Sequence, residues 1–175
     1  DGVIVANNKI YPRKRGNPEH AFAFKMVLSD QVAESKVVDI MWTPSKDGYL
    51  KPRIELEPVI LGGSKVKHAT GFNAQFIKEN KVGIGSLIRI VLSGDVIPHI
   101  EKVIEPAEEA LMPDVPYYWN ATGVDIILKD IKNNAIVNEK IILGFFTDVE
   151  GFGPGTTKKL IKGGYDSIAK ILAMD

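Results

Sequence analysis

The stretch Gly83–Pro98, GIGSLIRIVLSGDVIP, decides the fold of this chain. Its first half, Leu87–Leu92, is rich in β-branched residues and lies between glycines, which predicts a buried strand. Gly94 and Asp95 predict a turn. Pro98 interrupts the strand that restarts after this turn, which is typical of a bend or an edge.

One charge, Arg89, lies inside this apolar run. Successive side chains of a strand point to opposite faces, so Arg89 can point outward while Ile88 and Ile90 point into a small barrel. The flanking sequence supplies the other elements of that barrel. We expect strands over 37–42, 49–59, 66–70 and 100–104, a hairpin turn at Asp47-Gly48, and a helix over 73–80 that plugs the barrel.

Composition excludes several classes of protein. The 175 residues carry 22 Lys+Arg against 22 Asp+Glu, so any contact with nucleic acid must come from local patches or backbone amides. The absence of cysteine excludes disulfides and thiolate zinc sites, and the three histidines lack the spacing of metal ligands. No apolar run approaches the roughly 18 residues of a membrane span, and no signal peptide opens the chain. We expect a monomeric, intracellular protein without a membrane partner.

Three blocks of the chain resemble one known family. LEPVILGG at 56–63 resembles "LEPV.L.G", ATGFN at 69–73 resembles "ATLHN", and the run at 83–98 resembles the "AGDVIP" segment of NAD-dependent DNA ligases. The blocks occur in the family's order. The resemblance implies a mainly β fold with a small α part: a five-stranded oligonucleotide-binding (OB-fold) barrel followed by a helix-hairpin-helix element.

The first 33 residues resemble the end of the family's nucleotidyltransferase (adenylation) domain. DGVIV at 1–5 resembles "DGVVIK", and AFAFKM at 21–26 resembles "A.A(F/Y)KF". The resemblance implies that Lys25 contacts the nucleotide phosphate, where a lysine can neutralise the charge of phosphoryl transfer. It implies a positioning or metal-contacting role for Asp1. The pattern alone favours a surface lysine at position 25 and also fits a plain turn aspartate at position 1; the motif context reverses the preference for Lys25. Ala6 stands where the family motif has a lysine.

The family's nucleophile is a lysine in a "K.DG" motif upstream of these strands. Lys46-Asp47-Gly48 is superficially similar, but it lies in a turn after the adenylation motifs, so we reject it. The chain also opens directly on a strand-like run. We therefore expect a segment of a longer polypeptide that does not form the enzyme–AMP intermediate alone.

In the related ligases the barrel grips the minor groove of the duplex around the nick. Two adjacent arginines that often follow the family's central strand are replaced here by Val91 and Leu92. The remaining basic residues must then hold the phosphates, although each also fits a solvated surface charge. The candidates for DNA contact on the barrel are Lys46, Lys51, Arg53, Lys65, Lys67, His68 and Arg89; we expect His68 to be structural or at the surface rather than catalytic.

The segment 107–145 occupies the place of the family's four-cysteine zinc module. Without cysteine no such site can form, so we expect a zinc-free replacement linker, with a helical turn at 108–111 and a strand at 124–128. The aromatic run Tyr117-Tyr118-Trp119 fits a small packing cluster better than a platform for stacking on bases, which is the alternative.

The last segment, 146–175, contains VEGFGPGTTKKL at 149–160, which resembles the helix-hairpin-helix signature "h.G.GP.TA..L". Glycines at 151 and 153 permit a close approach of the backbone to a phosphate, and the following helix N-terminus attracts that anion. Asp166 is expected to cap the next helix. The alternative is a glycine-rich turn without a ligand. The candidate DNA contacts here are Gly151, Gly153, Thr156, Lys158 and Lys159.

These predictions divide the chain into 1–33 (adenylation-domain strands), 34–106 (OB-fold), 107–145 (linker) and 146–175 (helix-hairpin-helix). The resemblance implies part of a DNA ligase that seals nicked duplex DNA by adenylyl transfer, with NAD and Mg²⁺ as cofactors of the full enzyme. One alternative is a non-catalytic DNA-binding module, which Ala6 and the unusual linker favour. Another is an ATP-using ligase or capping-type nucleotidyltransferase, against which the barrel blocks and the hairpin argue.

Overall fold

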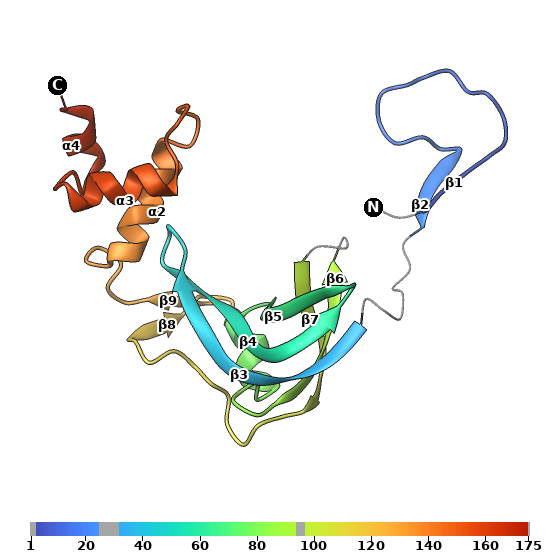
Figure 1. The fold of residues 1–175 in the computed structure, drawn as a ribbon, viewed down its shortest axis with the longest axis horizontal. Coiled ribbons are helices and arrows are strands. Elements are labelled where there is room, and N and C mark those ends of the chain that lie inside the picture. Colours follow the sequence, from blue (N-terminus) through green and yellow to red (C-terminus); the bar gives the residue numbers. More distant parts are fainter. Residues whose placement is uncertain (1–2, 25–31, 94–96, 175) are drawn as a thin grey trace.

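The computed structural model describes residues 3–24, 32–93 and 97–174 (Figure 1). Within these ranges the strands form a two-stranded sheet and a seven-stranded sheet. The strands are β1 Val3–Ala6, β2 Ala21–Phe24, β3 Val32–Pro44, β4 Tyr49–Leu61, β5 Ser64–Thr70, β6 Leu87–Ser93, β7 Ile97–Glu105, β8 Tyr117–Trp119 and β9 Ile126–Leu128. The helices are α1 Ala74–Glu79, α2 Ala135–Phe145, α3 Pro154–Lys162 and α4 Ile168–Leu172.

The large sheet closes on itself. Its strand order is β3-β6-β7-β5-β4, and an additional β3–β4 pairing joins the two ends into a five-stranded barrel, which β9 and β8 extend beyond β4. Both β3 and β4 are 13 residues long, and each contains a register shift that lets a strand bend around a small barrel. The predicted mainly β fold with an OB-type barrel is confirmed.

The central run lies in the barrel as its alternation predicts. Ile88 and Ile90 on β6 are fully buried, while the side chain of Arg89 lies on the outer surface. Pro98 is the second residue of β7 and lies opposite Leu92. The predicted turn at Gly94-Asp95 lies outside the described residues.

Helix α1 plugs the barrel, as expected for residues 73–80. Asn73 caps it: the Asn73 Oδ1 accepts a hydrogen bond from the backbone N of Phe76 at 2.8 Å. On its inner side Ala74 and Ile77 are fully buried. The core around Ile77 consists of Val37, Ile40, Ile54, Leu56, Leu61, Val66, Ala69, Val82, Ile88, Ile90 and Ile100.

The segment after the barrel is packed against it. The predicted helical turn at 108–111 is wrong, because the backbone of Leu111 bonds elsewhere: its N–H donates to Val82 at 2.9 Å and its carbonyl accepts from Trp42 Nε1 at 3.1 Å. The strand expected at 124–128 is present as β9, and β8, which the sequence did not indicate, pairs with it.

The aromatic run at 117–119 supports the packing interpretation for two of its three rings. Tyr117 and Trp119 are half-buried and meet edge to face at 6.5 Å, whereas Tyr118 points outward and is 47% exposed. They contact a second buried cluster formed by Leu50, Ala74, Ile126, Leu128 and Val137. Because Val137 belongs to α2, this cluster attaches that helix to the barrel.

The C-terminal helices differ in one detail from the expectation. The N-cap of α4 is Ser167, whose Oγ accepts a hydrogen bond from Lys170 N at 3.3 Å, and not Asp166. The carboxylate of Asp166 instead pairs with Lys170 Nζ at 2.7 Å. Helix α2 begins inside the predicted linker, and the domain boundaries themselves remain predictions. Among the described helices, none is long and apolar enough to cross a membrane.

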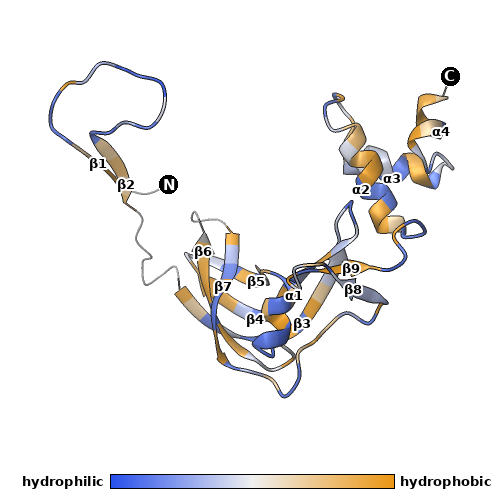
Figure 2. Ribbon diagram, turned by 180° about the vertical axis from the view of Figure 1, so that it is seen from behind, coloured by the Kyte–Doolittle hydropathy of each residue, from blue (hydrophilic) through white to orange (hydrophobic). Residues whose placement is uncertain are grey.

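Strands β1 and β2 form an antiparallel hairpin of their own. Figure 2 shows apolar strands and a largely hydrophilic connecting loop. Both faces of the pair are exposed, with Ile4 at 67% and Phe22 at 63%, so the described hairpin does not enclose a core. The predicted catalytic residues Lys25 and Asp1 lie outside the described residues.

The barrel core sets the stability of the chain. Ile54 is 0% exposed and Ile60, on the same strand, is 65% exposed. We expect Ile54→Ala to lower the free energy of unfolding by about 2–5 kcal/mol, because it removes buried methyl groups and leaves a cavity. The matched Ile60→Ala change is expected to alter it by less than about 0.5 kcal/mol. Urea denaturation measures both, and equal losses would contradict this assignment of the core.

Candidate nucleic-acid interface

Basic side chains line the outer face of the β4–β5 pair. Along β4, Leu50, Pro52 and Ile54 are buried, so that Lys51 and Arg53 project outward between them. On β5, Lys65 and Lys67 are exposed on either side of the buried Val66. Strand alternation thus exposes four of the predicted DNA contacts along this strand pair, with Arg53 opposite Thr70 near one end and Lys65 opposite Ile60 near the other.

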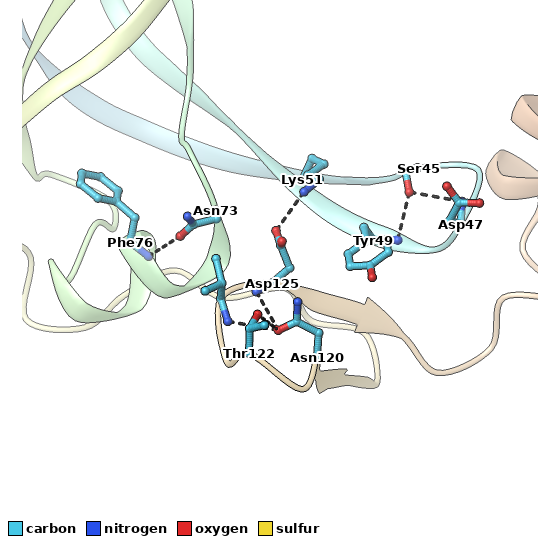
Figure 3. Close-up of polar contacts among 10 residues, drawn as sticks. Ser45, Asp47, Tyr49, Lys51, Asn73, Phe76, Asn120, Thr122 and Asp125 are labelled. Atoms are coloured by element: carbon cyan, nitrogen blue, oxygen red, sulfur yellow. Dashed lines mark hydrogen bonds and ion pairs between the residues drawn. The ribbon is translucent and has the colours of Figure 1, made fainter.

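These four cations are not equally free to bind phosphate. Lys51 Nζ lies 2.9 Å from the Asp125 carboxylate and 5.4 Å from the centroid of the Tyr49 ring (Figure 3). The loop from Asn120 to Asp125 fixes the backbone of Asp125: the Asn120 Oδ1 accepts hydrogen bonds from the backbone N of Val124 at 3.1 Å and of Asp125 at 3.3 Å. A phosphate would therefore compete with Asp125 for Lys51.

Three members of the face have no acidic partner. Within the described residues, Arg53, Lys65 and Lys67 form no ion pair. Lys46, in the β3–β4 turn, is paired with its neighbour Asp47 at 2.8 Å, but both side chains are about 60% exposed (62% and 60%). Such a surface ion pair contributes little to the stability of the fold, so Lys46 can readily exchange Asp47 for another anion.

Arg89 lies in a different environment from the other candidates. Its guanidinium donates to Glu34 Oε1 through Nη2 at 2.7 Å and Nε at 3.1 Å, and its Nη1 lies 3.9 Å from Glu101. These partners belong to β3 and β7, which flank β6 in the sheet. Arg89 is therefore held by a cross-strand ion pair, and its predicted contact with DNA would require the loss of that pair.

His68 lies on β5 opposite Glu55 of β4 and is half-buried, in line with the structural or surface role expected for it. Within residues 3–24, 32–93 and 97–174, no group of three or more His, Cys, Asp or Glu residues lies close enough to hold a metal ion. The basic loop between β1 and β2 borders a cavity of about 600 Å³ with Lys14 and Arg15 in its lining.

The glycine-rich hairpin connects α2 to α3. Gly151 has a φ of +77°, which few other residues adopt, and its carbonyl accepts a hydrogen bond from Thr156 Oγ1 at 3.1 Å. Gly153 is the N-cap of α3 and offers no capping side chain, and the first turn of α3 contains no acid. The amides of Gly155 and Thr156 belong to the first turn of α3, where N–H groups have no intrahelical acceptor and the positive end of the helix dipole stabilises an anion.

Two lysines follow this helix terminus. Lys158 Nζ lies 3.9 Å from Glu139 on α2, and Lys159 has no acidic partner in the part of the chain that the structure describes. Gly151, Gly153 and Thr156 thus lie at the N-terminal end of α3, whereas Lys158 lies near its middle and Lys159 in its last turn.

Buried contacts that the sequence pattern did not reveal hold the hairpin in place. Thr157 is fully buried, and its Oγ1 donates to the Gly153 carbonyl at 3.1 Å. The rings of Phe146 and Phe152 stack at 4.5 Å across the connection between α2 and α3. The Lys140 side chain of α2 donates to the Pro44 carbonyl at the β3–β4 turn, at 2.5 Å. Thr157 stands at the alanine position of the signature "h.G.GP.TA..L", and that small-residue position was the available signal for its burial; Phe146 and Lys140 lie outside the signature.

The closed five-stranded barrel with a plugging helix defines the chain as an OB-fold protein. Residues 34–111 match the family model described as the NAD-dependent DNA ligase OB-fold domain. The barrel of this chain therefore belongs to the family of NAD-dependent DNA ligase OB-fold domains.

Similarity to curated relatives extends over the whole chain. It is 41% identical over 177 residues to a DNA ligase of Acanthamoeba polyphaga mimivirus, an alignment that covers 99% of this chain and 28% of the relative. It is 30% identical to the DNA ligases of Desulfatibacillum aliphaticivorans, covering 99% of this chain and 29% of the relative, and of Psychromonas ingrahamii, covering 98% and 28%. The chain thus spans less than a third of the length of these relatives.

The Asp166–Lys170 pair offers a test of the helical region. The hydrogen bond and the positive charge of Lys170 hold the pKa of Asp166 below its ordinary value of 3.8. A lowered pKa stabilises the folded state at pH values above 3.8, and this contribution is lost as the pH falls through the lowered pKa. We expect Lys170→Met to raise the Asp166 pKa in an NMR titration, whereas Lys159→Met leaves it unchanged. An unaltered Asp166 pKa in Lys170→Met would contradict the pairing.

Proposed function

We propose that this chain is the part of an NAD-dependent DNA ligase that grips nicked duplex DNA, and that the full enzyme seals nicks by adenylyl transfer as a monomer. The family match of residues 34–111 supports the ligase assignment. The observation that carries the DNA-gripping role is the set of cations on β4 and β5 that lack acidic partners among the described residues, namely Arg53, Lys65 and Lys67.

The physical reason is the cost of binding phosphate with a cation that is already paired. An unpaired surface cation gives up only water and counterions when a phosphate approaches, and the release of counterions from DNA favours binding. A paired cation such as Arg89 must first lose its hydrogen bonds to Glu34, and that carboxylate would then repel the phosphate. We therefore assign the main phosphate contacts of the barrel to the β4–β5 face rather than to β6.

The hairpin supplies a second kind of contact. Backbone amides at the start of α3 can hold a phosphate without touching a base, and Lys159 adds positive charge in the last turn of the same helix. Contacts of this kind position a duplex and carry no sequence information. A ligase needs this property, because a nick can occur in any sequence.

The cofactors of the full enzyme, NAD and Mg²⁺, do not find a complete site in the described residues. The β1–β2 hairpin leaves both its faces exposed rather than enclosing a nucleotide, and the described carboxylates and histidines form no metal cluster. We therefore derive no step of adenylyl transfer from this chain. Its proposed part in the reaction is to hold the duplex.

A second candidate function is a non-catalytic DNA-binding module. The observation that favours it is Ala6, which stands on β1 opposite Ala21 where the family motif has a lysine. Labelling of a longer protein that contains this chain separates the candidates. Covalent labelling by NAD supports the ligase, labelling by ATP points to an ATP-using nucleotidyltransferase, and no labelling supports the module.

The DNA-gripping role is tested by binding of the 175-residue chain to nicked and intact duplexes over a salt series. We expect affinity to fall steeply with salt and to be higher for the nicked duplex. We expect Arg53→Ala to weaken binding to both duplexes and to reduce the salt slope by about one, because one phosphate contact is lost.

The matched control is Arg89→Ala, which removes an arginine of the same barrel that is already ion-paired. We expect it to leave the salt slope nearly unchanged, with circular dichroism confirming that both variants are folded. A slope reduced by Arg89→Ala and not by Arg53→Ala would place the DNA on the other face of the barrel. No binding by the wild-type chain at low salt would contradict the gripping role.

A further inference from the structure

Phe72 is a bulky residue in a backbone conformation that does not suit it. It lies between the end of β5 and the cap of α1 with a φ of +56°, a region that a residue with a bulky side chain rarely adopts. Its ring is nevertheless 52% exposed, so burial recovers only part of that conformational cost. Strain that is retained at an exposed side chain points to a use for the side chain itself.

The backbone on both sides of Phe72 is fixed. The Gly71 N–H donates to the Pro52 carbonyl at 3.2 Å, and a Cβ at position 71 would lie 2.9 Å from Ile54 Cδ1. On the other side, Asn73 caps α1 through its hydrogen bond with Phe76 N at 2.8 Å. The turn therefore imposes the positive φ, a conformation that glycine or asparagine would adopt at lower cost.

The Phe72 ring packs against two other aromatic rings. Its centroid lies 4.9 Å from that of Phe76 at an interplanar angle of 58°, and 6.2 Å from the ring of His99 at 78°. These contacts orient the aromatic group before any ligand arrives. A side chain that is ordered in advance loses little conformational entropy on binding.

The strand register places Arg53, one of the unpaired cations of the β4–β5 face, opposite the end of β5, two residues before Phe72. His99, which touches its ring, pairs with Thr70, and Thr70 pairs with Arg53 on β4. Residues directly opposite one another on neighbouring strands point to the same face, so Arg53 and Thr70 both project from the outer face of the barrel. The Nδ1 of His99 is buried and has no hydrogen-bond partner among the described residues. The strained backbone of Phe72 and the unpartnered His99 Nδ1 both lower stability, so this part of the barrel is not optimised for stability alone.

We propose that Phe72 is an apolar contact to duplex DNA whose ring lies against the sugar and base edges at a break in the stack, while Arg53 holds an adjacent phosphate. The inference rests on the proposed DNA-gripping function. Aromatic rings bind bases through their faces without reading the sequence, and unstacking costs least where the strand is already broken. The neighbouring free cation favours nucleic acid over an apolar protein surface as the occupant.

The test compares binding of Phe72→Asn and wild type, as the whole 175-residue chain, to nicked and intact duplexes of one sequence over a salt series. Asparagine tolerates the positive φ, so the turn is kept and the ring is lost. We expect affinity for the nicked duplex to fall about tenfold, the range of a lost base–aromatic contact, with a smaller loss on the intact duplex. The salt slope should not change, because no phosphate contact is removed.

Two further variants complete the design. Phe72→Tyr keeps an aromatic ring and should retain binding, and Ile84→Asn removes a side chain that is 66% exposed in the turn before β6 and should have no effect. Urea denaturation of each variant detects a purely structural role of the ring. If Phe72→Asn shifts the midpoint, Phe72→Gly, which also accepts the positive φ, replaces it.

Each outcome separates this inference from the function on which it rests. If the wild type binds and Phe72→Asn binds equally well, the role of Phe72 is wrong and the gripping function stands. If affinity falls equally in Ile84→Asn, the loss is not specific to Phe72 and the inference is overturned. If affinity falls only together with stability in both Phe72→Asn and Phe72→Gly, the ring acts structurally and the inference is overturned as well. If the wild type binds neither duplex, both proposals fail.

Discussion

The pairing of β3 with β4 closes the barrel, and every candidate contact on the barrel depends on it. It places Ile40 opposite Ile54 in the core, and a register shift between Val37 and Asp39 lets the same strand leave β4 and pair with β6. With the sheet closed, one face of each strand is enclosed and the other must face outward. The outward position of Arg53 and the inward position of Ile90 thus follow from a single closure.

The basic residues on the outer surface of the closed barrel differ in whether they have acidic partners. On the β3–β6–β7 side, Arg89 is satisfied by Glu34 and Glu101, so that charge there holds strands together. On the β4–β5 side, Arg53 and Lys67 have no such partners among the described residues. A balanced net charge therefore hides a local excess of positive charge, which bulk composition cannot reveal.

The strands and the plugging helix were predictable because their apolar positions repeat with the period of the element that they form. The short strand β8 and helix α2 were not predicted. Strand β8 has only three residues, and α2 begins inside the segment that we expected to be a linker. The division of the cations was also beyond the sequence. Lys51 and Asp125 are 74 residues apart, and only the folded chain brings them together. At the cap of α4, Ser167 and Asp166 both suited the pattern, and the local geometry selected Ser167.

The barrel and the hairpin reach a common property by different physical means. The barrel presents side-chain cations and one strained aromatic ring on a rigid closed sheet, whereas the hairpin presents backbone amides whose direction is fixed by Gly151 and by the buried Thr157. Neither the hairpin amides nor the aromatic ring has the paired donor and acceptor geometry that distinguishes one base pair from another. A surface of this composition suits a partner that is recognised by its backbone and by an interruption in its stacking. A nick has these two features, which is the physical reason why the proposed function can use both elements.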